Sequence, residues 1–422
     1  MLDPVTLALI LAGGILVIGF LGDYLFHKTG VPDMLFLIIL GMVIGPITGL
    51  ADANAVTSFA PYLAALGLVF ILFDGGMTLN IYRVFSESPR ALVLAAVEFA
   101  LSATATSLLM IFLVIPKLPI LYSILFGTIL GGSSSMIVIS MASRVKVSGR
   151  SSTILSLESA INDVLCIVFS LIIIEIATLG GTVDIATIAR SVAGRFSIGA
   201  MLGILLGVGW LSILKRIVKA HYSYIVTLAV VLLAYAFSEF LGGSGALCSL
   251  LFGIMLGNEK EIYGILRMKK PTNQVVDPGL KRFESEIAFL LRTFFFVYIG
   301  LIATMPSLLS ISVGIALSFT LLLIRIGAVH VATVRSDLVE DRPIMSAMLT
   351  RGLAAVVLVT LPLQYADPVK YPEVGAIFRQ LSPIYINIAI VVILATAAIA
   401  TIGIPILRRR AQKLPKSETE PE

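Results

Sequence analysis

Charged residues are scarce in this 422-residue sequence, where Asp, Glu, Lys and Arg together make up 13%. Soluble domains usually carry about 25%. Cysteine is nearly absent, and Cys166 and Cys248 both fall inside apolar runs, so a disulfide framework is not expected. No phosphate-binding glycine loop, zinc motif or nucleophile elbow is present. With 58% hydrophobic residues, the chain is predicted to be an all-α polytopic membrane protein rather than an enzyme.

Apolar runs of spanning length follow one another along almost the whole chain. A window of about 19 residues gives about thirteen transmembrane helices. They are expected at 5–26, 31–50, 58–79, 90–115, 119–143, 152–178, 188–214, 222–240, 244–258, 284–304, 307–334, 343–364 and 382–407. No Lys or Arg precedes the first run, so we interpret it as a span and not as a cleaved signal peptide.

Lysine and arginine are distributed unequally between alternate loops. Of the 30 residues, 22 lie in the odd-numbered loops and the C-terminal tail, five lie in the opposite loops and three lie within spans. This excess places the 22 residues in the cytoplasm, with the N-terminus outside and the C-terminus inside. The net charge of +5 therefore reflects membrane orientation and does not indicate a nucleic-acid partner.

An odd number of spans allows two inverted six-helix repeats, 1–180 and 222–407, joined by a linker helix at 188–214. A short cytoplasmic tail at 408–422 completes one membrane domain. Glycine-rich interruptions fall at corresponding places, Gly131-Gly132-Ser133-Ser134-Ser135 in span five and Thr350-Arg351-Gly352 in span twelve. Paired breaks of this kind point to a site near the bilayer midplane, so we predict discontinuous helices 5 and 12.

The most informative motif is Glu158-Ser159-Ala-Ile-Asn162-Asp163, in the middle of span six. On a helix Ser159 and Asp163 share one face, while Glu158 and Asn162 form an adjacent stripe. Acids at this depth are costly and tend to be functional. Because burial disfavours a bare charge, we predict that Asp163 exchanges a proton for a cation. The alternative is a structural acid paired with an arginine.

Other polar residues are weaker candidates. Ser159 and Ser133 could offer oxygen ligands to a cation or act as gates, or they could bond their own helix backbone. Ser134 belongs to the same expected unwound segment. Asp74, at the end of span three, could be a second acid facing the site. Further acids lie nearer span ends, where they could reach water: Glu98, Glu175, Glu239 and Glu286.

Two residues each need a countercharge within the membrane, Glu158 and Arg325. We predict that they form a buried pair that braces the helices. Arg351 competes as the partner of Glu158, and the sequence leaves both pairings open.

The Glu158–Asp163 motif resembles the Glu-Ser-x-x-Asn-Asp motif of monovalent cation:proton antiporters, specifically the NhaP-like sodium/proton exchangers. Phe73-Asp74-Gly75-Gly76, Phe294–Gly300 and Arg351-Gly352 are in keeping with that resemblance. It implies that Asp163 binds the cation and the proton, that Asn162 is its neighbouring amide and that Ser159 is a ligand on the same helix.

The resemblance also implies that Ser133 stands where relatives often have Thr, that Asp74 lies near a family carboxylate and that Glu158 with Arg325 forms a core ion pair. Members are usually homodimers with a core that shifts to give alternating access. One departure is Ser133-Ser134-Ser135, where NhaP-like relatives often read Thr-Asp-Pro. It resembles the Ser-Ser-Thr of Kef-type potassium/proton antiporters, so potassium is an option beside sodium and lithium.

These features predict an electroneutral exchanger of a monovalent cation for a proton in the plasma membrane, surrounded by lipid and without a cofactor. Asn162 beside Asp163 leaves one charge to be neutralised by either ligand. Two rivals remain. One is a sodium-coupled symporter of an organic anion on the same inverted-repeat architecture, and the other is a non-transporting membrane sensor.

Overall fold

The computed structural model describes residues 3–50, 60–79, 89–117, 119–134, 137–138, 141, 147–179, 185–217, 223–265, 278–304 and 306–413. Every regular element within these ranges is a helix, in agreement with the predicted all-α class. In chain order they are α1 (Pro4–Thr29), α2 (Asp33–Met42), η1 (Val43–Ile47), α4 (Ala60–Thr78), α6 (Pro89–Leu109), η2 (Met110–Val114), α7 (Ile120–Ile129), α9 (Gly149–Thr178), α10 (Ile185–Ile217), α11 (Ser223–Phe240), α12 (Gly245–Gly257), α13 (Glu259–Ile265), α14 (Pro278–Ile302), α15 (Leu308–Ala332), η3 (Asp337–Val339), α16 (Arg342–Ala347), α17 (Leu353–Thr360), η4 (Leu361–Tyr365) and α18 (Gly375–Lys413).

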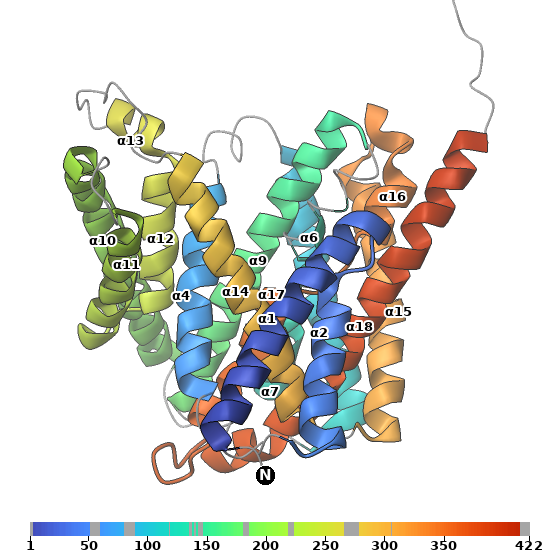
Figure 1. Cartoon of the computed structure of the whole chain (residues 1–422), viewed down its shortest axis with the longest axis horizontal. Coiled ribbons are helices and arrows are strands. Elements are labelled where there is room, and N and C mark those ends of the chain that lie inside the picture. The colour runs from blue at the N-terminus through green and yellow to red at the C-terminus, as the bar shows by residue number, and fades with distance from the viewer. Residues whose placement is uncertain are drawn as a thin grey trace, which may run out of the picture.

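Seven of the described helices are long and apolar enough to cross a membrane: α1, α6 with η2, α9, α10, α11, α15 and α18. Shorter apolar helices are α2 with η1, α4, α7, α12, and α17 with η4. Together with the 25-residue α14, these elements overlap every span that the sequence predicts. Figure 1 shows the N-terminus and the far end of α18 at opposite ends of the bundle, as an odd number of crossings requires. Which end faces the cytoplasm stays a prediction.

Several spans begin where a serine can cap the first turn. The hydroxyls of Ser148, Ser244 and Ser307 each accept a hydrogen bond from the backbone N–H three residues later, at 3.2, 3.3 and 3.1 Å. Such caps satisfy backbone donors that have no partner inside the helix. The predicted starts of spans six, nine and eleven therefore fall within a few residues of the observed ones.

The described helices form two groups by their contacts. We call α1, α2, α4, α10, α11, α12 and α14 the panel helices, because their main contacts are with one another. We call α6, α7, α9, α15, α16, α17 and α18 the core helices for the same reason. Glycines permit the closest panel contacts: a Cβ added at Gly76 of α4 would lie 2.9 Å from the Ile254 nitrogen of α12. Small residues let membrane helices approach in this way.

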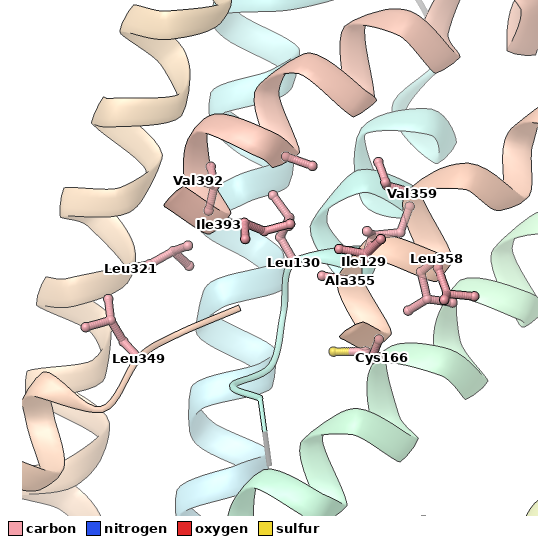
Figure 2. Packing of buried hydrophobic residues seen from close by; sticks show 14 of the residues in the cluster. Ile129, Leu130, Cys166, Leu321, Leu349, Ala355, Leu358, Val359, Val392 and Ile393 are labelled. Carbon is pink, nitrogen blue, oxygen red and sulfur yellow. The ribbon is translucent and has the colours of Figure 1, made fainter. Parts of the chain in front are cut away.

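Two core spans are interrupted, as predicted for helices 5 and 12. The α7 helix ends at Ile129, and α16 ends at Ala347 before α17 begins at Leu353. The two extended segments meet where the Ser134 N–H donates to the Thr350 carbonyl oxygen at 2.7 Å. Figure 2 shows the apolar side chains packed around both breaks, among them Leu130 and Leu349. The irregular backbone is thus covered by protein, as it must be at membrane depth.

Some boundaries differ from the prediction. The last helix, α18, begins at Gly375 and continues to Lys413, so it is longer at both ends than the expected span 382–407. It includes Pro383 and Pro405, and proline need not end a helix that its neighbours support. Ser135 and the predicted tail beyond Lys413 lie outside the described residues.

Candidate functional site

The acidic motif lies on one uninterrupted helix, α9, which is anchored at its start. The Asp341 carboxylate, from the loop before α16, accepts hydrogen bonds from the hydroxyls of Ser148 and Ser151, both at 2.6 Å. A negative charge at a helix N-terminus is favourable because it faces the unpaired N–H groups. This contact fixes α9 to the second half of the chain.

Within the motif, Glu158 and Asn162 face a buried polar network. Glu158 Oε1 accepts hydrogen bonds from Ser133 Oγ at 2.8 Å and from Asn162 Nδ2 at 2.5 Å. All three side chains are fully buried. Asn162 therefore orients Glu158, one helical turn away, and Ser133 ties the first break to the same carboxylate.

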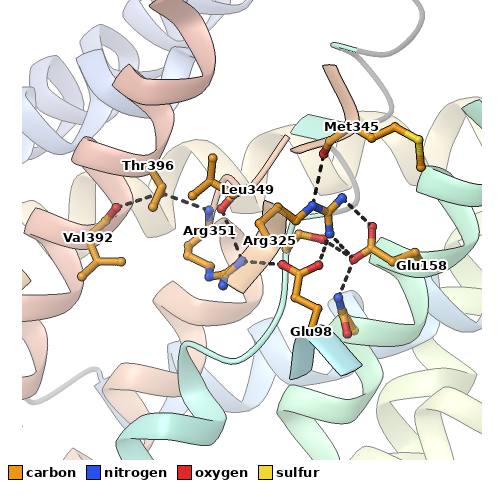
Figure 3. Close-up of polar contacts among 10 residues, drawn as sticks. Glu98, Glu158, Arg325, Met345, Leu349, Arg351, Val392 and Thr396 are labelled. Carbon is orange, nitrogen blue, oxygen red and sulfur yellow. Dashed lines mark hydrogen bonds and ion pairs between the residues drawn. The ribbon is translucent and has the colours of Figure 1, made fainter. Parts of the chain in front are cut away.

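Glu158 belongs to a chain of four buried charges (Figure 3). Arg325 Nη1 lies 3.0 Å from Glu158 Oε1, and Arg325 Nη2 donates to Glu158 Oε2 at 3.1 Å. Arg325 also pairs with Glu98, whose other oxygen accepts from Arg351 Nη1 at 3.4 Å. Two carboxylates and two guanidinium groups cancel in charge. The pairing of Glu158 with Arg325 is thus confirmed, and the hydrogen-bonded partner of Arg351 is Glu98.

Glu98 was expected near a span end with access to water, and that expectation is wrong. Its side chain is 1% exposed. The α6 helix begins at Pro89, so Glu98 lies about 14 Å along the helix axis, close to the middle of a bilayer. A signal was present in the sequence: Glu98, Ser102 and Thr106 recur every four residues and form a polar stripe on an apolar helix.

A cavity of about 390 Å³ lies between the panel helices α4 and α14 and the core helices α9 and α17. Asp163 and Asp74 both line it, and both side chains are half-buried. Its polar wall also includes Ser134, Ser156, Ser152, Thr153 and Thr78. The cavity thus brings together the two acids that the sequence selects and surrounds them with oxygen atoms.

Of the other predicted ligands, Ser133 and Ser159 are held by other contacts. Ser133 donates to Glu158, and the Ser159 hydroxyl donates to the Leu155 carbonyl of its own helix. Among the described residues, the serines that line the cavity are Ser134 of the first break and Ser152 and Ser156 of α9. The ligand roles of Ser133 and Ser159 stay predictions.

Comparison with known proteins identifies the family of this chain. The transmembrane sodium/hydrogen exchanger family matches residues 13–410. The chain belongs to that family. The resemblance noted in the sequence is confirmed, the family is one of transporters and not of enzymes, and a sodium-coupled symporter finds no support.

Individual relatives of this chain are distant. It is 28% identical over 385 residues to a protein named K(+)/H(+) antiporter NhaP2 from Shewanella sp. (strain ANA-3), covering 87% of this chain and 61% of the relative. It is 24% identical over 302 residues to Na(+)/H(+) antiporter 1 of Methanocaldococcus jannaschii, covering 68% and 66%. The chain thus spans about three fifths of the length of the first of these relatives.

The fold of this chain matches a solved one. The structure of the sodium proton antiporter MjNhaP1 from Methanocaldococcus jannaschii at pH 8 aligns with a TM-score of 0.74 at 20% identity, over 97% of this chain and all of that chain. An electron-microscopy structure of the same antiporter aligns with a TM-score of 0.71.

On the side of the protein away from the cavity, a second charge cluster joins the two helix groups. Arg195 of α10 pairs with Glu175 at the end of α9, at 2.6 Å, and with Glu239 at the end of α11, at 3.1 Å. The cavity reaches Thr78 at the C-terminal end of α4 and Ser152 at the start of α9. It therefore approaches the face opposite the Arg195 cluster, which the arginine and lysine distribution predicts to be cytoplasmic.

Proposed function

We propose that this exchanger moves a monovalent cation in one direction and a proton in the other across the plasma membrane. Asp163 binds either ligand. The supporting observation is the shared cavity, in which the carboxylates of Asp163 and Asp74 occur together with the hydroxyls of Ser134 and Ser156. Oxygen donors suit hard cations. Sodium, lithium and potassium are the candidate substrates, and the proposal needs no cofactor.

Electroneutral exchange follows from the charges around Asp163. The preceding residue, Asn162, brings no charge, and its amide donates a hydrogen bond to Glu158. Glu98 and Glu158 are balanced by Arg325 and Arg351. In the proposed cycle one cation or one proton neutralises the Asp163 carboxylate, and electroneutrality requires that the charge of Asp74, which lines the same cavity, stay unchanged. Because an uncompensated charge at membrane depth is costly, the site crosses only when it carries a ligand.

Alternating access follows from the position of the cavity between two helix groups. If the core helices move against the panel helices, the cavity closes on one side and Asp163 becomes reachable from the other. The Arg195 cluster joins the groups on that other side and must open in the same step. Exposed apolar side chains on α1, such as Leu9 and Phe20, are available to lipid or to a second copy in a homodimer.

The experiment is proton flux in sealed liposomes that hold the purified protein and a preset pH gradient. Sodium, lithium and potassium are added in turn, with the membrane voltage either free or clamped. We expect at least one cation to dissipate the gradient, at a rate that clamping does not change. Failure of all three cations between about pH 5 and 8, where buried carboxylates and protons can compete, contradicts the proposal.

The matched variants are Asp163→Asn, which removes the proposed binding group, and Asp367→Asn, which removes an exposed acid in the loop before α18. Exchange is expected to be lost in the first and retained in the second. Both should be expressed and folded to the same extent, which size-exclusion chromatography checks. Normal exchange by Asp163→Asn would show that another group carries the ion.

A further inference from the structure

Glu98 bridges the two buried arginines. One of its oxygens pairs with Arg325 of α15, and the other accepts from Arg351 in the second break. The same carboxylate thus ties a continuous helix to an irregular segment. In Figure 3 its side chain lies between the two guanidinium groups.

Apart from Glu98, few described groups accept a hydrogen bond from the Arg351 side chain. Its side chain is fully buried, and its Nε and Nη2 atoms have no hydrogen-bond partner among the described residues. Its Nη1 also donates to the Leu349 carbonyl at 3.3 Å, and its backbone N–H donates to Thr396 at 3.4 Å. These contacts supply no negative charge. An arginine buried without enough acceptors can turn toward another carboxylate.

Besides Glu98, the charges of Glu158 and, after it, of Asp163 act on Arg351. Arg351 and Asp163 belong to adjacent structures. Arg351 follows Thr350, which accepts from Ser134, and Ser134 lines the cavity with Asp163. The other charges acting on this region are Glu158, Glu98 and Arg325.

We propose that Glu98 is a positioning residue that binds the Arg351 guanidinium and so keeps this internal positive charge from competing with the transported cation at Asp163. The inference rests on the proposed function, because it concerns the affinity of that same site. Glu98 itself does not line the cavity among the described residues and need not contact the ion. It acts through the charge and position of Arg351.

The test is the KM for the cation in the liposome assay, using whichever of sodium, lithium or potassium the wild type exchanges. Glu98→Gln keeps the shape of the side chain and removes its charge. The uncompensated charge on Arg351 should raise KM about tenfold, which is the effect of about 1.4 kcal/mol of added repulsion. The maximum rate should change much less than KM.

A second variant changes KM in the opposite direction. Arg351→Gln removes the internal competitor and leaves Glu98 with Arg325, so KM should fall below the wild-type value. In the double variant Glu98→Gln with Arg351→Gln the competitor is absent, so KM should match that of Arg351→Gln and the effect of Glu98→Gln should disappear. Glu98→Asp keeps the charge and should retain a near-wild-type KM.

The direction of each change in KM distinguishes a positioning role of Glu98 from a role in bracing the helices alone. If Glu98 only braces the helices, Glu98→Gln should lower the maximum rate at constant KM and the double variant should be worse than either single variant. That result would overturn the proposal. If Glu98→Gln does not fold, Arg351→Gln still decides, since a raised or unchanged KM contradicts the inference. A wild type that exchanges no cation would instead refute the proposed function.

Discussion

Arg325→Met is the most direct test of the buried charge chain, because Arg325 neutralises two carboxylates at once. Its side chain is fully buried, and its partners Glu98 and Glu158 are 1% and 0% exposed. Methionine fills much of the same volume without a charge. Removing one partner from a buried ion pair costs about 3–5 kcal/mol, since a carboxylate is left uncompensated in an apolar setting.

The matched control is Arg195→Met, which also removes an arginine that pairs with two glutamates. The Arg195 side chain is 37% exposed, and its partners Glu175 and Glu239 are 17% and 39% exposed. Water and salt screen such pairs, so we expect a loss of about 1 kcal/mol or less.

The assay is unfolding in detergent micelles with increasing dodecyl sulfate, followed by far-ultraviolet circular dichroism. Arg325→Met should unfold at a clearly lower dodecyl sulfate fraction than both the wild type and Arg195→Met. The unfolding midpoint of Arg325→Lys should lie between those of the wild type and Arg325→Met, because lysine keeps the charge but loses the forked geometry that reaches two acids. Equal midpoints for Arg325→Met and Arg195→Met would show that burial does not raise the cost of removing an arginine from its two acids.

Two further predictions concern the cavity and the opposite face. Asp74→Asn should raise KM for the cation several-fold in the liposome assay while exchange persists, because Asp74 lines the cavity but Asp163 retains its charge; complete loss of exchange would make Asp74 an equal partner. Arg195→Ala should speed amide hydrogen exchange in η4 and at the end of α9, because Tyr365 of η4 lies within range of the Arg195, Glu175 and Glu239 charges. Unchanged amide hydrogen exchange in both segments would show that the Arg195 cluster does not hold its face of the protein closed.

The features that the sequence predicted well are polar groups inside apolar runs. Asp163, Asn162 and Glu158 stand out because each is costly to insert in a membrane, and the two breaks stand out because glycine and serine interrupt long spans. Helix periodicity correctly separated Asp163 from the stripe of Glu158 and Asn162. The observed network and cavity follow that separation.

The features that the sequence did not predict depend on depth and on tertiary contacts. The depth of Glu98 requires the helix start at Pro89 to be known, and a shift of one or two turns moves an acid from the interface to the midplane. Which serine of the first break faces the cavity cannot follow from periodicity, because Ser133 and Ser134 lie in irregular backbone. The choice between Arg325 and Arg351 as the partner of Glu158 arises from packing between spans distant in sequence.

A cation and a proton are proposed to compete for the Asp163 carboxylate, and proton release on cation binding measures that competition. Purified protein in detergent and weakly buffered solution is titrated with the transported cation while the pH is recorded. We predict that each cation bound releases a proton, that lowering the starting pH weakens cation binding, and that Asp163→Asn abolishes the release. Cation binding by the wild type without proton release would contradict competition between the cation and a proton at Asp163.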